Sequence, residues 1–308
     1  MGLKQAEGAR GAAVLTFDSF VDRLAFRSRL VGLPPFRSMR AHSVAARTRA
    51  FDLTRPPGAH AIGALADQIR RDGVAPLDRA SFELLLPSQV TESLRGLGEA
   101  IGDGWRWGAD DSILEADAVF RLRPEIYLAG MEAALLDLAE AYIGQSCFYL
   151  ACTLKCERPD ARMFGARHWH LDVEDERMLR ILVYLNDVDA DGGPFEYLTP
   201  QATERFCAEA GYSRGYANEA FVPTSLSEAD RKRSLGRAGS AVIFDGTRVL
   251  HRASLPTGRA RYSLTFTYTS RRPKRIYRAS RLSHNTKREV DAIVGARERA
   301  AIPAARLF

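Results

Sequence analysis

The pattern of apolar and polar positions changes near residue 146. Before it, apolar residues recur every three or four positions, as in helices that bury one face. This spacing predicts helices over 62–73, 88–101 and 124–142, with Ser88 as an N-cap and Pro124 at a first helical position. Residues 1–145 are therefore expected to form a mostly helical layer.

From residue 146 onward, apolar positions occur in short runs or in alternation, which is typical of strands. Strands are predicted at 147–156, 178–185, 195–198, 240–244 and 261–269. The first should place Tyr149, Thr153 and Lys155 on one face. The last should do the same with its even-numbered residues, Tyr262, Leu264, Phe266 and Tyr268. Short strands separated by turns predict an antiparallel jelly roll.

One domain of 308 residues accommodates these elements. Its jelly-roll core should span 146–272, with an insertion at 201–236 that is helical at 201–210. A helical tail should occupy 273–308, starting at the capping box formed by Thr286 and Glu289. The expected fold class is thus mainly β, a double-stranded β-helix with flanking helices.

Composition narrows the function classes. The chain is 46% hydrophobic with a net charge of +6. This favours an anionic small molecule, or contact with a membrane surface through the basic run at 271–275. No aromatic–basic pattern indicates nucleic acid. The four cysteines form no CxxC pair, and neither a signal peptide nor an apolar run of about 18 residues is found. We therefore expect a cytoplasmic chain without a transmembrane segment.

The segment RHWHLD (167–172) carries the clearest chemical pattern. On a strand, His170 and Asp172 project from the same face and can bind one metal ion. His251, after the apolar run SAVIF (240–244), is the candidate for a second histidine. Two histidines and one carboxylate on one face of a metal leave three positions open, an arrangement that suits Fe(II) in oxygenases.

Ten residues after His251, Arg261 and Ser263 share a strand face. A guanidinium binds a carboxylate with two parallel hydrogen bonds, and a serine hydroxyl can add a third. These residues are candidates for the distal carboxylate of 2-oxoglutarate. Arg259 is a rival, but it lies in the turn that begins at 256–258.

Four segments together resemble the phytanoyl-CoA dioxygenase-like branch of the Fe(II)/2-oxoglutarate oxygenases: WHLD (169–172), YLNDVDADGGPFEYL (184–198), FDGTRVLHR (244–252) and RYSLTFTY (261–268). The resemblance covers about residues 146–272. It implies iron on His170, Asp172 and His251, and 2-oxoglutarate bound to Arg261. It also implies a polar co-substrate contact from a neighbouring strand, for which the candidates are Thr153, Lys155 and Tyr184.

The implied reaction consumes O2 and 2-oxoglutarate, releases succinate and CO2, and hydroxylates or desaturates a substrate. Asp172 argues against halogenation, because halogenating relatives lack this carboxylate. The substrate is expected to be a small molecule or lipid-like compound. Trp169, Arg248 and Arg252 flank the metal residues and are candidates for contacts with it.

Two other function classes remain open. The sequence also fits a cupin metal pattern, in which the ligands would be His168, His170, Glu174 and His251. Such a cupin would bind a metal without using 2-oxoglutarate. The spacing between His170 and His251 is long for a compact cupin, and the proline–glycine turn before the second cupin histidine is absent. A jelly-roll binding module without metal is the third possibility. The sequence contains no GxSxG motif, no P-loop and no dinucleotide-binding GxGxxG motif.

Overall fold

The structure is a computed structural model that describes residues 34–54, 60–102, 113–212, 215–217, 227–277 and 280–303. The chain forms two compact units, Met1–Pro56 and Pro57–Phe308. The described part of the first unit is one helix, α2 (Pro34–Thr54). All other described elements belong to the second unit. None of the described helices is both long enough and apolar enough to cross a membrane.

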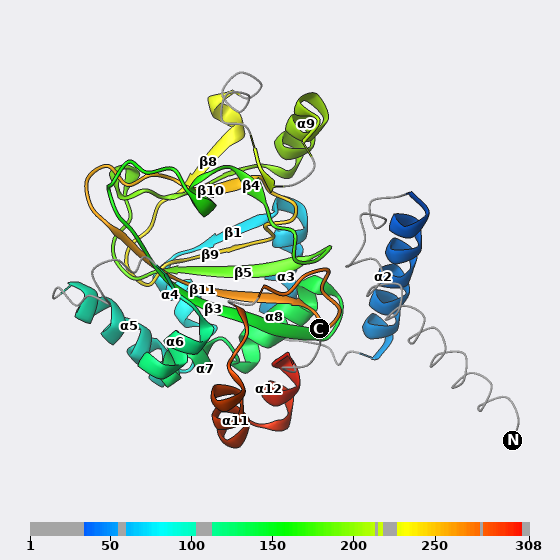
Figure 1. The fold of residues 1–308 in the computed structure, drawn as a ribbon, viewed down its shortest axis with the longest axis horizontal. Helices are drawn as coiled ribbons and strands as arrows, with labels where there is room; N and C mark the ends of the chain where they lie inside the picture. Colours follow the sequence, from blue (N-terminus) through cyan, green and yellow to red (C-terminus); the bar gives the residue numbers. More distant parts are fainter. Residues whose placement is uncertain are drawn as a thin grey trace, which may run out of the picture. The chain divides into compact units, whose positions relative to one another are not determined.

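Two antiparallel sheets face each other in the second unit (Figure 1). The large sheet has the order β1 (Val74–Leu77), β9 (Ala241–Phe244), β5 (Met178–Tyr184), β11 (Arg261–Ser270), β3 (Cys147–Glu157) and β2 (Ile113–Leu114). The small sheet has the order β7 (Gly215–Tyr216), β4 (His170–Leu171), β10 (His251–Ala253), β6 (Phe195–Leu198) and β8 (Arg231–Ser234). The predicted jelly roll is confirmed.

Short strands from unexpected regions complete both sheets. β1 and β2 come from the part of the chain predicted to be helical, and they form the two edges of the large sheet. β7 and β8 come from 201–236 and form the edges of the small sheet. The predicted insertion is therefore partly built into the barrel. None of these four short strands has the apolar run or the clear alternation that would mark it as a strand in the sequence.

Helices cover the large sheet on the face turned away from the small sheet (Figure 1). They are α3 (His60–Asp72), α4 (Arg79–Glu83), α5 (Ser88–Gly102), α6 (Ala116–Leu122), α7 (Pro124–Ala129), α8 (Ala133–Ile143), α11 (His284–Ile293) and α12 (Ala296–Ala301). α9 (Pro200–Ala210) lies beside the small sheet, and the 3-10 turns are η2 (Gly165–Arg167), η3 (Ala190–Gly192) and η4 (Glu228–Asp230).

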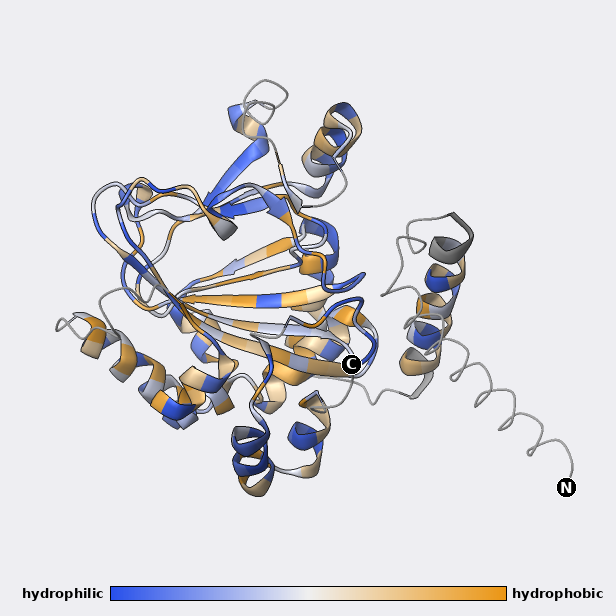
Figure 2. Ribbon diagram, in the orientation of Figure 1, coloured by the Kyte–Doolittle hydropathy of each residue, from blue (hydrophilic) through white to orange (hydrophobic). Residues whose placement is uncertain are grey.

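The two faces of the large sheet differ in chemistry. The even-numbered residues of β11, from Tyr262 to Tyr268, are buried in one core with the helices, as predicted. Its odd-numbered residues, from Arg261 to Thr269, face the barrel interior and are polar. Burying the apolar face stabilises the fold by roughly 25 cal/mol per Å², while the other face supplies polar groups for a site. The strands of the large sheet are accordingly mostly hydrophobic in Figure 2, and β5 shows one hydrophilic segment.

A β-bulge overturns part of the predicted face of β3. The register of β3 against β11 shifts between Thr267 and Tyr268, which pair with Ala151 and Tyr149. Tyr149 therefore lies in the outer core, and its hydroxyl donates to the Tyr127 carbonyl at 2.9 Å. The prediction that Tyr149 shares a face with Thr153 and Lys155 is wrong, because a bulge inverts the alternation.

Two predicted helix boundaries are also wrong. The helix over 124–142 is two helices, α7 and α8, separated near Gly130. A side chain at Gly130 would begin only 2.4 Å from the Tyr149 ring, so the break brings the backbone close to β3. In the tail, the N-cap is Ser283 rather than Thr286. Glu289 bonds Arg121 and forms no capping box.

Candidate metal centre

Three potential metal ligands meet where β4 and β10 pair. His170 and His251 are directly opposite each other across the two strands. Asp172 follows β4, and its backbone N–H donates to the Gly246 carbonyl at 2.8 Å. One ligand atom from each of the three residues lies within 4.8 Å of the others. Within the described residues, this is the one group of three or more that has metal-ligand spacing.

Both imidazole rings are held in the tautomer that a metal requires. The Nδ1 atom of His170 lies 2.8 Å from the His168 carbonyl oxygen, and that of His251 lies 2.9 Å from the Val249 carbonyl oxygen. A carbonyl only accepts, so each Nδ1 must carry the proton. The Nε2 atoms are then unprotonated in the neutral rings, and each lies 4.0 Å from an Asp172 oxygen. Such outer hydrogen bonds orient metal-binding histidines.

The charges at the triad favour the metal-binding protonation states. Burial, followed by the neighbouring His170, lowers the pKa of His251 to about 3, so this ring is neutral at physiological pH. Burial alone would raise the pKa of Asp172. The positive charge of Arg180 is the largest of the effects that outweigh burial and lower that pKa to about 2. The neutral His251 nitrogen and the ionised Asp172 carboxylate therefore face the same point as His170 Nε2.

The turn between β9 and β10 places His251. The buried carboxylate of Asp245 accepts from the Tyr142 hydroxyl at 2.5 Å and from the backbone N–H of Thr247 at 2.9 Å. A Cβ atom at Gly246 would lie 1.9 Å from an Asp172 carboxylate oxygen. Only glycine lets the turn pass this close to Asp172, a potential metal ligand, which explains the Asp–Gly pair after β9.

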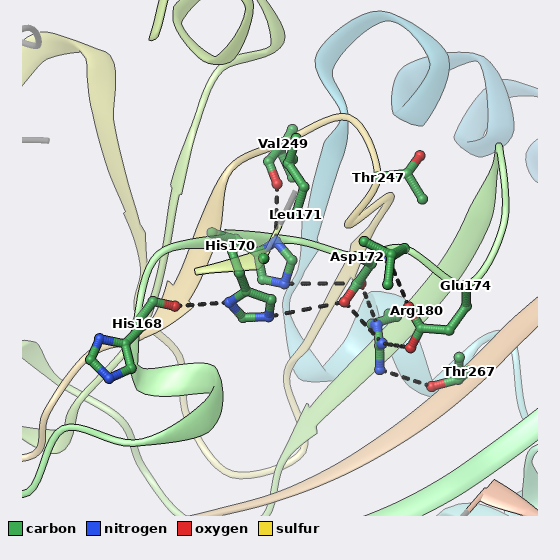
Figure 3. A network of polar contacts seen from close by, with 12 residues as sticks. His168, His170, Leu171, Asp172, Glu174, Arg180, Thr247, Val249 and Thr267 are labelled. Carbon is green, nitrogen blue, oxygen red and sulfur yellow. Dashed lines mark hydrogen bonds and ion pairs between the residues drawn. The ribbon is translucent and has the colours of Figure 1, made fainter. Parts of the chain in front are cut away.

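A residue that the sequence reasoning missed completes the site (Figure 3). Arg180 on β5 binds both oxygens of Asp172, with Nε–Oδ2 2.6 Å and Nη2–Oδ1 3.0 Å. Its Nη2 also donates to Glu174 at 3.0 Å, and its Nη1 donates to the Thr267 hydroxyl at 3.3 Å. The available signal was one charged residue in an otherwise apolar strand, MLRILVY.

His168 and Glu174 are not part of the ligand group. The His168 side chain is turned away from Asp172 in Figure 3, and its ring lies 5.3 Å from the Tyr216 ring. Its contribution to the centre is the carbonyl oxygen that fixes His170. Glu174 is paired with Arg180. The geometry thus brings together the facial triad and leaves out two members of the cupin set.

Arg261 lies deep in the barrel among other charged side chains. On β11 it pairs in register with Glu157 of β3, and Ser263 pairs with Lys155. Glu157 is fully buried and contacts Lys155 and Arg167. Nη1 of Arg261 donates to the Gly193 carbonyl, whereas its buried Nε has no hydrogen-bond partner among the described residues. A buried donor without a partner is rare and suggests a missing acceptor.

Comparison with known proteins gives matches only at the level of structure. Neither the protein-family models nor the curated proteins give a match. EctD from S. alaskensis in its apoform matches with a TM-score of 0.51 at 16% identity, over 83% of this chain and 90% of EctD. The likeness shows the fold.

Two further structures match with lower scores. EctD with 2-oxoglutarate and 5-hydroxyectoine gives a TM-score of 0.48 at 17% identity, over 75% of this chain and 80% of that one. The epimerase SnoN in complex with Fe3+, alpha-ketoglutarate and nogalamycin RO gives 0.45 at 17% identity, over 68% and 84%.

The other candidate co-substrate residues lie at different places in the barrel. The Thr153 hydroxyl donates to Glu115 at 3.4 Å. The Tyr184 hydroxyl donates to the Ser234 carbonyl at 2.8 Å and accepts from the Phe195 N–H, and the side chain borders a cavity of about 510 Å³ beside β1. Arg259, the rival of Arg261, is half-exposed and pairs with Asp189 at 2.6 Å.

The three candidate substrate contacts each have a structural partner. Nη1 of Arg248 donates to the carbonyl of Arg70, at the end of α3. Arg252 pairs with the buried Glu196 at 2.6 Å and lies over the Trp169 ring, 4.8 Å from its centroid. Trp169 itself is buried in a cluster beside α9. All three remain predictions as substrate contacts.

Proposed function

We propose that this chain is an Fe(II)- and 2-oxoglutarate-dependent dioxygenase that hydroxylates or desaturates a small-molecule substrate. The observation that carries the proposal is the triad of His170, Asp172 and His251, in which a backbone carbonyl holds each Nδ1 and leaves each Nε2 directed at Asp172. The resemblance of four segments to the phytanoyl-CoA dioxygenase-like branch supports it. The fold shared with EctD is consistent with it.

The donor set fits Fe(II). Two imidazole nitrogens and one carboxylate oxygen on one face are the ligands of non-haem Fe(II) oxygenases, and they leave positions for a chelating co-substrate and O2. Structural zinc sites are instead closed by four protein ligands, often including cysteine. No cysteine of the described residues belongs to the group of potential ligands.

The interior also fits a dicarboxylate. Lys155, Arg167 and Arg261 bring three positive charges, opposed by the carboxylates of Glu157 and Asp160. The unpartnered Nε of Arg261 suits the distal carboxylate of 2-oxoglutarate. Lys155 would add a second cation, and Ser263, opposite it in the register, would add a hydroxyl.

Each part of the chain then has a defined task. When bound, iron and 2-oxoglutarate supply the oxidation of the substrate by O2, with release of succinate and CO2. The triad residues hold the metal, and Arg261 orients the co-substrate. Phe195 and Phe244 pack against His251, with ring centroids 5.5 and 5.1 Å from the imidazole, and keep water from that side.

We infer that the substrate approaches past His170, whose side chain is 15% exposed, compared with 7% for His251. The Tyr216 ring lies 5.9 Å from the His170 ring, and Tyr216 as a whole is 60% exposed. The backbone N–H of Arg275 donates to the Glu174 carbonyl, and the Arg275 guanidinium lies over the Tyr277 ring, 4.5 Å from its centroid. Exposed aromatic rings and an exposed guanidinium beside the metal centre favour a ring-containing, anionic substrate.

The proposal is tested by titrating metal-free protein with Fe(II) and then 2-oxoglutarate without oxygen, while the visible charge-transfer band of the chelate is followed. The band should form, survive His168→Ala and be lost with His251→Ala. Iron binding without the band, or a requirement for His168, would replace the proposal with the cupin alternative. Absence of metal binding would leave a jelly-roll module without an iron centre.

The inference about the substrate has a separate test. Succinate release should be screened with carboxylated or phosphorylated ring compounds and with their uncharged analogues. A compound that stimulates succinate release by the unmodified protein should stimulate it less in Tyr216→Ala. Without added substrate, the variant and the unmodified protein should release succinate at the same rate. Stimulation that favours the uncharged analogues, or that survives Tyr216→Ala unchanged, would contradict the inference.

A further inference from the structure

Arg180 connects two carboxylates that the chain places two residues apart. It binds Asp172 through two nitrogens, and one of these, Nη2, also holds Glu174 at 3.0 Å (Figure 3). Both carboxylates are largely buried, with 6% and 9% of their side chains exposed. Because one guanidinium nitrogen touches both, the two carboxylates are neighbours, and only Asp172 belongs to the ligand group.

Glu174 is therefore a second carboxylate that could reach the metal. Its Oε2 accepts from the neighbouring Val173 N–H at 2.9 Å, and Arg180 supplies the cation for its Oε1. A buried carboxylate without a cationic partner is costly. Without Arg180, a bound metal ion would be the natural replacement for the missing charge.

We propose that Arg180 is a positioning residue that keeps the centre a three-ligand site, by holding Glu174 away from the metal and fixing Asp172. This inference rests on the proposed function, because the role of Arg180 is to keep open the coordination positions that 2-oxoglutarate needs. With Arg180 in place, the metal has the three protein ligands of an oxygenase. Without Arg180, it would have four, including Glu174.

The charge of the centre leads to the same conclusion. With a divalent metal bound, Asp172, Glu174 and Arg180 leave the centre with one positive charge, which attracts the 2-oxoglutarate dianion. Replacing Arg180 with glutamine would make the loaded centre neutral and free Glu174 to bind. Metal affinity should then rise or stay constant, while 2-oxoglutarate affinity falls. Removing the charge of Glu174 as well restores both the single positive charge and the three ligands.

The test uses full-length protein and three variants: Arg180→Gln, Glu174→Gln and the double variant. Calorimetry would follow Mn(II) binding to metal-free protein, and then 2-oxoglutarate binding to the loaded protein. Arg180→Gln should bind Mn(II) at least as tightly as the unmodified chain and bind 2-oxoglutarate at least about tenfold more weakly. The double variant should recover 2-oxoglutarate binding to within about threefold. Glu174→Gln alone should retain it.

Visible spectra of the Co(II)-loaded proteins add a readout of coordination. The spectrum of Arg180→Gln should differ from that of the unmodified protein before 2-oxoglutarate is added, and the double variant should restore it. Unmodified binding of 2-oxoglutarate in Arg180→Gln would overturn the inference. So would a defect that the double variant does not repair, because a purely structural role predicts no rescue. If the unmodified protein binds neither Mn(II) nor 2-oxoglutarate, the proposed function itself is wrong.

Discussion

Replacing Arg261 with methionine should weaken 2-oxoglutarate binding without removing the metal. In the structure, one Arg261 nitrogen already serves the Gly193 carbonyl and another lies 3.9 Å from Glu157, which leaves Nε as the donor without a partner. We therefore count one charge-assisted hydrogen bond to the co-substrate, worth about 1.5–3 kcal/mol. Its loss lowers affinity by roughly tenfold to 150-fold. Glu157 keeps Lys155 and Arg167 as partners, so no buried carboxylate is left uncompensated.

Calorimetric titration of Mn(II)-loaded protein with 2-oxoglutarate measures this effect. Arg259→Met is the matched control, because Arg259 lies two residues away, is half-exposed and pairs only with Asp189 among the described residues. The control should bind 2-oxoglutarate like the unmodified protein, and both variants should bind Mn(II) normally. A loss below about threefold in Arg261→Met, or an equal loss in Arg259→Met, would refute the assignment of Arg261.

Three further predictions follow from the turn and the triad. Gly246→Ala should weaken Mn(II) binding by more than about tenfold, because the new Cβ would lie 1.9 Å from the Asp172 carboxylate. Gly258→Ala is the control, since its Cβ would lie 3.6 Å from the nearest atom, and it should leave Mn(II) binding unchanged. Calorimetry compares the Mn(II) affinities of the two variants. Tyr142→Phe removes a donor to the buried Asp245 and should lower the free energy of unfolding in urea by about 1.5–3 kcal/mol; an unchanged midpoint would contradict this. Since the pKa of Asp172 is lower in the folded chain, about 2, than in an unfolded one, about 3.9, its stabilisation of metal-free protein is present above pH ~4 and lost as pH falls towards 2. Asp172→Asn should therefore unfold at lower urea concentration than the unmodified chain at pH 7, with a gap of about 2 kcal/mol that closes in acid; a gap that persists at pH 2 would disprove it.

The grouping of His170, Asp172 and His251 could be predicted because its pattern is local and chemically specific. His170 and Asp172 are two apart on an extended segment, and the apolar run before His251 marks it as following a strand. The fold was predictable for the same reason, since the five predicted strands lie within one or two residues of the predicted bounds. Apolar and polar residues alternate with period two in the sequence wherever a strand has one apolar and one polar face.

What could not be predicted depends on contacts between distant segments. Arg180 is a single charge in an apolar strand, and only the arrangement of β4 beside the barrel interior shows that it meets Asp172. The bulge near Thr267 inverts the face of Tyr149 without leaving any mark in either strand's own pattern. Helical periodicity likewise continues across Gly130, because apolar residues are buried on both sides of the break.

The direct pairing of His170 with His251 has a consequence for the mechanics of the barrel. It is the one residue pair that joins β4 to β10, whereas β11 and β3 are joined by ten. A metal ion bound to both imidazoles would therefore act as a crosslink at the weakest junction of the small sheet. Amide hydrogen exchange should show this unevenly. A chelator should speed exchange around His170 and His251, while the centre of β11 remains protected.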